Sequence, residues 1–195
     1  MLRYYIFYKP FKVISQFSAE GEKQTLADFL PHLSKNIYPV GRLDFDSEGL
    51  LLLTDDTSLT HRLLDPSFGH ERTYWVQVEG TINDEAIKKL QQGVDINIDG
   101  KKYRTKKAAA KILSPPPFVP ERNPPIRVRQ TIPDSWLSLT ITEGKNRQVR
   151  RMTAAVGFPT LRLIRHSIGK VTIGDMQPGD VVEADASIKQ ILFGK

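Results

Sequence analysis

Four consecutive leucines at residues 50–53 are the feature that most constrains the fold of this chain. Gly49 and Thr54 bound the run, which is too short for a buried helix and therefore predicts a strand buried on both faces. The turn just before it, residues 41–49, is rich in acidic residues and glycine. A carboxylate on such a turn stands at the end of a rigid core strand, where a side chain can line a cleft.

Three further segments have the pattern of strands. Residues 4–8 are aromatic and β-branched, whereas residues 72–80 and 136–141 alternate between apolar and polar side chains. In the second segment the alternation places Tyr74 on the same face as two valines. We therefore expect Tyr74 to point in the same direction as core residues.

Helix signals stand between these strands. Thr25 and Asn83 are predicted N-caps, and residues 59–64 predict a short helix. Asn146 is predicted to cap a further helix that runs to Val156, with Gly157 as its C-terminal glycine. Strands interleaved with helices indicate a mixed α/β or α+β sheet protein.

Chain length and loop composition bound the number of domains. With 195 residues and 39% hydrophobic content, the chain can bury one substantial core, in one domain or two packed subdomains. The proline-rich residues 114–125 are expected to form a surface loop within one fold, not a linker.

Charge is distributed unevenly along the chain. The net charge is +6, but residues 1–98 carry 10 Lys/Arg and 14 Asp/Glu, whereas residues 99–195 carry 18 and 8. A basic half of this kind is the electrostatic footprint of a partner that is a polyanion. We favour nucleic acid over the alternative that the charge serves only solubility.

Cysteine content and apolar runs limit the compartment and the chemistry. The chain has no cysteine, which excludes disulfides, thiolate catalysis and Cys-based metal sites and fits a reducing cytoplasm. Its start lacks the pattern of a signal peptide, and no apolar run could span a bilayer. We expect a cytoplasmic protein with no membrane partner.

The acidic turn allows more than one interpretation. The spacing of four acids approaches a calcium-loop pattern: Asp44, Asp46, Glu48 and Asp55. Such a loop needs a helix on each side, so we expect no metal here. We expect Asp46 and Glu48 to solvate the loop or to bond its backbone. A carboxylate beside Arg42 would stay ionised, as a nucleophile or electrostatic stabiliser requires. On these residues alone, a structural ion pair of Asp44 is the stronger alternative.

Other catalytic patterns are not found. The four histidines lack metal-ligand spacing, and neither a P-loop nor a Gly-x-Ser-x-Gly elbow is present. The aromatic motifs of an RNA-recognition domain are also missing.

Several ordered motifs together resemble the RsuA family of pseudouridine synthases. The matching segments are residues 41–44, 47–54, 73–78, 143–152 and 163–169, so the resemblance covers nearly the whole chain. It implies an α+β fold with a mixed, largely antiparallel central sheet, helices packed on it, and an active-site cleft between two halves. It also implies a cofactor-independent isomerase that converts uridine in RNA to pseudouridine.

Two segments narrow the resemblance within the family. Residues 122–127 and 157–165 are most similar to the RluE type, which modifies 23S ribosomal RNA. The family often carries an S4 RNA-binding domain before the catalytic one. Because this chain opens on the expected catalytic strand, we expect residues 1–195 to be a single catalytic domain of two packed subdomains without an S4 domain.

The resemblance also implies site residues. Asp44 corresponds to the catalytic aspartate, as nucleophile or as base at C2′, and Tyr74 to the aromatic residue that stacks on the target base and assists proton removal. Arg150 would pair with Asp44, and Arg42 and Leu163 would contact the substrate. Lys9 and Pro10 match a structural motif of the family. Two places depart from the usual residues of the family: Arg72, and the pair Asp56 and Thr57, which we expect in an exposed loop.

The basic half supplies candidates for contacts with the RNA backbone. Flipping a base out of its helix costs a few kcal/mol, which phosphate contacts can offset. The candidates are Lys101, Lys102, Arg104, Lys106, Lys107, Arg127, Arg129, Arg147, Arg151 and Arg165. The expected partner is 23S ribosomal RNA or its precursor, free or in an assembling particle, and the expected state is a monomer.

Two other classes of function remain open at this point. An inactive RNA-binding or ribosome-assembly protein would need only the basic half, with Asp44 as a structural ion pair. A phosphodiesterase-like enzyme would use the acids of residues 44–55 with a divalent metal.

Overall fold

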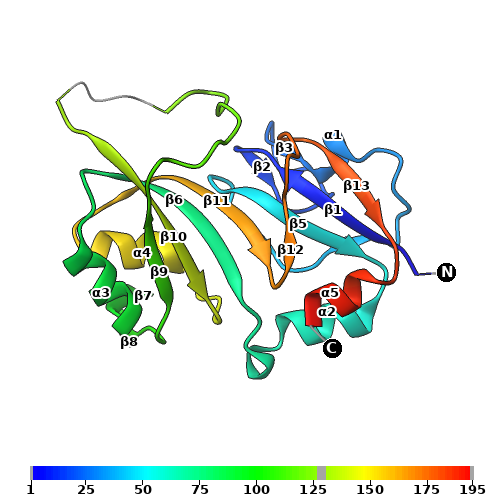
Figure 1. Cartoon of the computed structure of the whole chain (residues 1–195). Helices are drawn as coiled ribbons and strands as arrows, with labels where there is room; N and C mark the ends of the chain where they lie inside the picture. Colours follow the sequence, from blue (N-terminus) through cyan, green and yellow to red (C-terminus); the bar gives the residue numbers. More distant parts are fainter. Residues whose placement is uncertain (1, 127–130, 194–195) are drawn as a thin grey trace. The chain divides into compact units, whose positions relative to one another are not determined.

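The computed structural model describes residues 2–126 and 131–193 and divides the chain into two compact units (Figure 1). Unit 1 contains the chain up to His70 and again from Arg165 onward, and unit 2 contains Glu71–Ile164. The proline-rich residues 114–125 contain no helix or strand and lie within unit 2, which confirms the prediction of a loop and not a linker between units.

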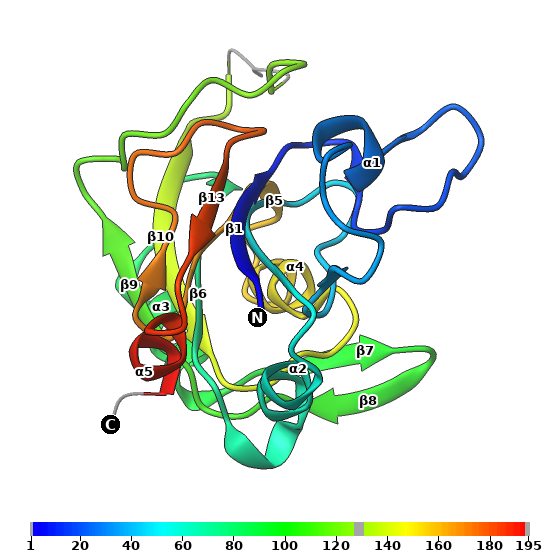
Figure 2. The ribbon, with the colours of Figure 1, turned by 90° about the vertical axis from the view of Figure 1, so that its right-hand side faces the viewer.

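A sheet forms the centre of unit 1. The hydrogen-bonded order is β13-β1-β5-β11, and Figure 2 shows β13, β1 and β5 next to one another. The strands are β1 (Tyr4–Lys9), β4 (Tyr38–Pro39), β5 (Glu48–Thr54), β11 (Thr160–Ile168, in this unit from Arg165 on), β12 (Val171–Thr172) and β13 (Val181–Ala184). Every residue of β5 is buried, which confirms the strand predicted from the leucine run.

Glycine is required at the start of β5. Gly49 lies opposite Lys9 in the antiparallel pairing of β1 with β5. It has a φ of +102°, and a Cβ atom there would lie 2.4 Å from the carbonyl oxygen of Arg165 in β11. The close approach of β5 to β11 therefore excludes any larger residue.

Short elements complete unit 1: β2 (Val13–Ile14) paired in parallel with β3 (Gln24–Thr25), α1 (Leu26–Phe29), α2 (Thr57–Leu64), the 3₁₀ turn η1 (Pro66–Phe68) and α5 (Ile188–Phe193). Thr25 caps α1 as predicted, in a capping box with Asp28. The helix ends at Phe29, and Pro31 follows shortly after, which disfavours a helical conformation at Leu30.

Asp56 is not in an exposed loop, and that expectation is wrong. Its carboxylate is buried, caps α2 through the backbone N–H groups of Ser58 and Leu59, and accepts a hydrogen bond from Tyr4 Oη at 2.9 Å. Burial acts to raise the pKa of Asp56, but hydrogen bonds from Lys189 and Ser58 hold it well below its usual range. Asp56 thus joins the start of α2 to Tyr4 of β1 and, through an ion pair, to Lys189 of α5.

Unit 2 is built on the strand order β11-β6-β10-β9. Its elements are β6 (Arg72–Glu79), α3 (Asp84–Gln92), β7 (Asp95–Ile98), β8 (Lys101–Arg104), β9 (Ala109–Leu113), β10 (Asp134–Ile141), α4 (Gln148–Ala155) and the first part of β11. In β6, Tyr74, Val76 and Val78 are buried and alternate with half-buried neighbours, as predicted. β7 and β8 form a separate antiparallel hairpin that contacts α4 (Figure 2).

Helices α3 and α4 of unit 2 begin differently. Asn83 caps α3 as predicted, and Gly93 ends it. For α4 the predicted cap at Asn146 is wrong: the capping position is Arg147, in the left-handed conformation and without a side-chain hydrogen bond. Asn146 Oδ1 instead accepts a hydrogen bond from Arg151 at 3.1 Å.

The elements of both units confirm the predicted α+β class. Within the described parts of the chain, no helix is long and apolar enough to cross a membrane.

We predict that Gly49→Ala destabilises the protein more than Gly21→Ala. Both glycines have positive φ, but a Cβ atom at Gly21 meets nothing within 4 Å. The control should cost about 1–2 kcal/mol of backbone strain, whereas Gly49→Ala should add an overpacking cost of about 1–3 kcal/mol. Urea unfolding measures both, and equal losses would contradict the close approach of β5 to β11.

Candidate active site

Asp44 lies in unit 1 on the loop between β4 and β5. The backbone N–H of Ser47 donates to the carbonyl oxygen of Asp44 at 3.0 Å, which closes a tight turn just before β5. Leu43, the residue before Asp44, is buried, whereas Asp44 itself is half-buried. The turn therefore keeps the Asp44 side chain partly accessible at the end of a strand that is buried throughout.

The segment at residues 12–15 runs beside this loop. The Lys12 N–H donates to the carbonyl oxygen of Phe45 at 2.8 Å. Ser15 Oγ donates to the Leu43 carbonyl at 2.8 Å and accepts from the Leu43 N–H at 3.1 Å. The residues on both sides of Asp44 are thus held by hydrogen bonds to one segment.

Lys9 anchors that segment. Its side chain is fully buried, and Nζ donates to the carbonyl oxygens of Pro10 at 2.8 Å and Val13 at 2.7 Å. Burial lowers the pKa of Lys9 to about 7, against the opposing effect of the Glu48, Asp46 and Asp44 carboxylates. A lysine in a strand of aromatic residues carries no sequence signal of burial. Lys9 could therefore be singled out only because it matches a structural motif of the family.

Burial contradicts one of the two roles expected for Glu48 in the acidic turn. It is 1% exposed and opens β5, so it does not solvate the loop; it acts electrostatically on buried Lys9. Because the acidic turn leads directly into a strand, it lacks the helix that would follow a calcium loop. Across the described residues, no three His, Asp or Glu side chains are grouped so that they could hold a metal ion.

Arg42 and Arg165, the two arginines of unit 1 that were predicted to contact the substrate or the RNA, differ in exposure. Arg42 is exposed, two residues before Asp44. Arg165 is 4% exposed, and its Nε donates to the carbonyl oxygen of Leu50 at 2.7 Å. The prediction that Arg165 contacts the RNA backbone is therefore wrong, because its guanidinium is buried against β5.

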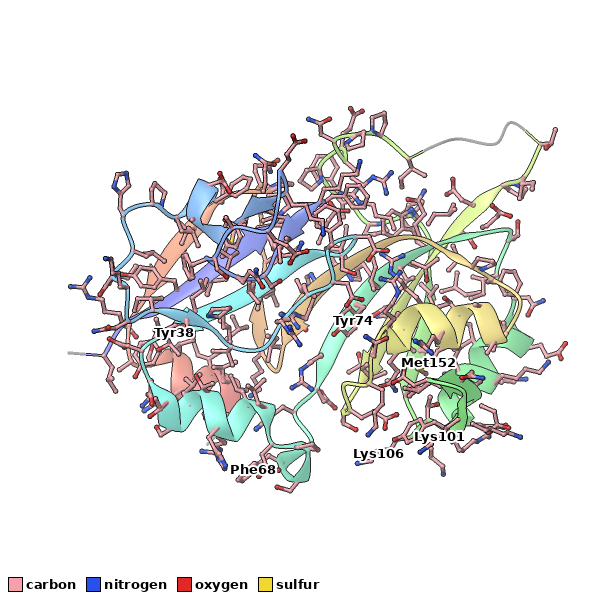
Figure 3. The ribbon with its side chains drawn as sticks, turned by 180° about the vertical axis from the view of Figure 1, so that it is seen from behind. Tyr38, Phe68, Tyr74, Lys101, Lys106 and Met152 are labelled. Carbon is pink, nitrogen blue, oxygen red and sulfur yellow. The ribbon has the colours of Figure 1, made fainter. Side chains whose placement is uncertain are left out.

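Three of the predicted site residues lie in unit 2. Tyr74 is in β6, opposite Leu139 of β10, and is 9% exposed (Figure 3). Leu163 is buried in β11, and Arg150 is half-buried on α4. The structure thus groups Asp44 with Arg42 in unit 1 and Tyr74 with Arg150 and Leu163 in unit 2.

A buried carboxylate organises the start of α4. Glu143 Oε1 accepts from Gln148 Nε2 at 2.6 Å and from the Lys106 N–H at 2.8 Å, and Oε2 accepts from Tyr103 Oη at 2.5 Å. The hydrogen bond to Glu143 raises the pKa of Tyr103. Gln148 Oε1 in turn accepts from the Lys145 N–H at 2.9 Å. This network fixes the helix that carries Arg150 to the basic segment around β8, a link that the sequence did not reveal.

The remaining basic candidates belong to unit 2. The Asp95 carboxylate forms salt bridges with two of them. Its Oδ2 lies 3.1 Å from Lys102 Nζ, and its Oδ1 lies 3.7 Å from Arg104 Nη1. Arg151 is half-buried and donates to the Asn97 carbonyl. Arg127 and Arg129 lie outside the described residues. The exposed candidates are Lys101, Lys102, Arg104, Lys106, Lys107 and Arg147, and Figure 3 marks Lys101 and Lys106.

We predict that Lys9→Met changes how stability depends on pH. The pKa of Lys9 is about 7 in the folded protein against 10.5 as a model value, so the unfolded chain binds more protons between these two values. The contribution of Lys9 to the free energy of unfolding should therefore rise with pH in this window, by at most ~1.4 kcal/mol per pH unit.

Urea unfolding at several pH values tests this prediction. The stability of the wild-type protein minus that of Lys9→Met should increase from pH 7 toward pH 10. Lys88→Met, at an exposed position of α3, is the matched control and should show a constant difference. A constant difference for Lys9→Met as well would contradict the burial of its ammonium group.

Comparisons with known proteins agree with the motifs. A family model described as RNA pseudouridylate synthase matches residues 3–155. The ribosomal large subunit pseudouridine synthase E of Xanthomonas axonopodis pv. citri is 53% identical over 172 residues, covering 87% of this chain and 87% of that protein. The protein of the same description from Vibrio parahaemolyticus is 49% identical over 174 residues, covering 89% of this chain and 70% of that protein.

Solved structures agree in fold. A crystal structure described as a pseudouridylate synthase has a TM-score of 0.79 at 27% identity and covers 98% of this chain and 74% of that one. A human RNA pseudouridylate synthase domain-containing protein has a TM-score of 0.60 at 14% identity, covers 97% and 82%, and shows a similar fold alone. The chain therefore belongs to the RNA pseudouridylate synthase family, within it to the RluE type of the RsuA group, and is an isomerase.

Proposed function

We propose that this protein isomerises a specific uridine of large-subunit ribosomal RNA to pseudouridine, with Asp44 as the catalytic carboxylate. The observation that carries the proposal is the similarity to two proteins described as ribosomal large subunit pseudouridine synthases, over at least 87% of this chain. The half-buried Asp44 on its hydrogen-bonded turn supports the choice of carboxylate.

The reaction needs one carboxylate and a path for protons. In one route a carboxylate oxygen of Asp44 bonds to C1′ as the N1–C1′ bond breaks, and the bond electrons leave with uracil N1. After the uracil turns, C5 attacks C1′ and releases the carboxylate; the C5 proton is lost and N1 gains one. In the other route Asp44 removes the C2′ proton, giving a glycal and the uracil anion, and returns it as the C5–C1′ bond forms. The C5 proton is then lost and N1 gains one, as in the first route. Neither route changes the oxidation state of the nucleotide overall.

Tyr74, Arg150 and Leu163 are proposed to act on the same uridine. Tyr74 would stack on the uracil and assist loss of the C5 proton, while Arg150 would keep Asp44 ionised. Leu163 would line the base pocket and Arg42 would contact the nucleotide. The support is the match of these residues to the family motifs, together with the Glu143 network that holds the Arg150 helix in place.

The basic residues of unit 2 are proposed to bind the RNA backbone. Exposed lysines and arginines gather on and after β8, and the hairpin of β7 and β8 contacts α4. Phosphate contacts at these positions would offset the cost of extruding the target base. The proposed contacts are Lys101, Lys102, Arg104, Lys106, Lys107, Arg147 and Arg151 in the described structure, with Arg127 and Arg129 outside it.

We further propose that the substrate is 23S ribosomal RNA or its precursor, free or within an assembling particle, and that the protein acts as a monomer in the cytoplasm. The descriptions of the relatives support the ribosomal target, and the absence of cysteine fits the compartment. Mapping pseudouridine in ribosomal RNA from cells with and without the protein would identify the modified uridine.

We predict that Asp44→Asn abolishes isomerisation, because an amide neither attacks C1′ nor removes the C2′ proton. Release of tritium from RNA labelled at C5 of uridine measures the reaction, and release by the wild-type protein should persist in EDTA. Asp55→Asn is the matched control, since Asp55 at the other end of β5 accepts a hydrogen bond from the Arg3 N–H that an amide oxygen can keep.

Other outcomes of the same assay identify other functions. Binding of RNA without tritium release by the wild-type protein would indicate an RNA-binding protein, and strand cleavage that needs a metal would indicate a nuclease. Full activity of Asp44→Asn would refute the catalytic assignment.

We predict that RNA affinity falls steeply with salt and that the double variant Lys106→Gln, Lys107→Gln weakens this dependence. Each lost phosphate contact should reduce the slope of log K against log salt by about 0.7–0.9. Lys88→Gln, an exposed lysine of α3 in the same unit, should leave the slope unchanged. Equal slopes for the double variant and this control would remove residues 106–107 from the RNA surface.

A further inference from the structure

One buried hydroxyl group satisfies both backbone groups of the residue before Asp44. Ser15 is 3% exposed and Leu43 is 7% exposed. Ser15 Oγ donates to the Leu43 carbonyl oxygen at 2.8 Å and accepts a hydrogen bond from the Leu43 N–H at 3.1 Å. These two residues are 28 positions apart in the sequence, so the contact joins two separate segments of unit 1.

Leu43 needs such a partner because it belongs to no strand. β4 ends at Pro39 and β5 begins at Glu48, so Leu43 lies between the two strands and outside both of them. Buried N–H and C=O groups without partners are costly. The Ser15 side chain therefore does for Leu43 what a neighbouring strand does for a residue in a sheet.

The residue after Asp44 is held by the same segment. Phe45 accepts a hydrogen bond from the Lys12 N–H at 2.8 Å, and Lys12 has a φ of +59°. Between Lys12 and Ser15 lies β2, which is paired in parallel with β3. The main chain of Asp44 is consequently fixed on both sides to a segment that is itself part of a sheet.

We propose that Ser15 is a positioning residue for Asp44. By clamping both polar groups of Leu43, the Ser15 hydroxyl fixes the direction in which the main chain enters Asp44 and thereby the orientation of the carboxylate. Ser15 does not contact the substrate in this role; it acts through Leu43. The inference rests on the proposed function of Asp44 as the catalytic carboxylate.

The expected effect follows from the demands of orientation. A displacement of a catalytic group by about 1 Å can cost on the order of 100-fold in rate. Ser15→Ala removes the clamp, and we expect kcat to fall about 10- to 100-fold. The proposed phosphate contacts are in unit 2 and are unchanged in this variant. Such contacts contribute equally to binding in the ground state and in the transition state, so KM for RNA should stay within about threefold of the wild-type value.

Thr54 supplies a matched control in the same unit. Its buried hydroxyl also makes two backbone hydrogen bonds, donating to the Arg3 carbonyl at 2.6 Å and accepting from the Asp56 N–H at 3.0 Å. Thr54→Val removes both without changing the size of the side chain. It lies at the opposite end of β5 from the Asp44 loop and should lower stability while leaving kcat unchanged.

The experiment compares steady-state tritium release and urea stability for the wild-type protein, Ser15→Ala, Ser15→Thr, Ser15→Cys and Thr54→Val. Ser15→Thr keeps the hydroxyl and should restore kcat to within about fivefold of the wild-type value, because its oxygen can both donate and accept. Ser15→Cys keeps the shape of the side chain with a larger terminal atom, but its thiol is a weak donor and a weak acceptor, so its kcat should fall between those of the wild-type and alanine proteins. If Ser15→Ala does not fold, the cysteine and threonine variants decide the question.

The outcomes separate this inference from the proposed function. A loss of kcat in Ser15→Ala or Ser15→Cys that threonine restores and Thr54→Val does not reproduce supports the positioning role. If the wild-type protein is active and Ser15→Ala and Ser15→Cys retain its kcat, the positioning role is refuted while the isomerase assignment stands. The same holds if the kcat of these two variants falls no more than that of Thr54→Val. An inactive wild-type protein would instead refute the proposed function.

Discussion

The buried ammonium group of Lys9 is the interaction on which the arrangement around Asp44 depends. Removing a lysine from water is costly unless hydrogen bonds and charges compensate. Here Nζ donates to the Pro10 and Val13 carbonyl oxygens. The carboxylates of the acidic turn, residues 41–49, oppose the fall in the pKa of Lys9 that burial causes. Since Val13 begins β2, the ammonium group fixes the segment that in turn holds the residues on both sides of Asp44.

This organisation suits chemistry that relies on a single carboxylate. When no group other than side chains takes part, the rate depends on how well the carboxylate is aimed at the sugar. β5 supplies rigidity because it is buried throughout, and Gly49 allows β5 to approach β11 closely. In unit 2, the Glu143 network gives comparable support to the helix that carries Arg150.

Features with local sequence signals could be predicted. The leucine run predicted β5, alternation predicted the buried face of β6, and cap residues predicted the starts of α1 and α3. These signals lie within a few residues of the structure that they determine. The family motifs extended the prediction to the fold class and to the type of enzyme, which the comparisons confirmed.

Features that depend on distant contacts could not be predicted. The burial of Arg165 follows from a hydrogen bond to Leu50, 115 residues away, and the burial of Asp56 depends on Tyr4 and Lys189. The start of α4 was misplaced because the buried Glu143 holds Gln148, which lets the helix begin after a left-handed Arg147 without a side-chain cap. The site residues themselves came from resemblance, because for the acidic turn alone a structural ion pair of Asp44 is the stronger alternative.

Hydrogen exchange at the Leu43 amide, followed by NMR in the protein without RNA, tests the central claim most directly. Amides with persistent hydrogen bonds exchange only through opening reactions whose free energy reports local stability. The account predicts that the Leu43 amide exchanges as slowly as the amides of neighbouring β5, since Ser15 holds it as a strand would. Exchange at the rate of an unprotected loop amide would contradict the claim that the backbone entering Asp44 is fixed.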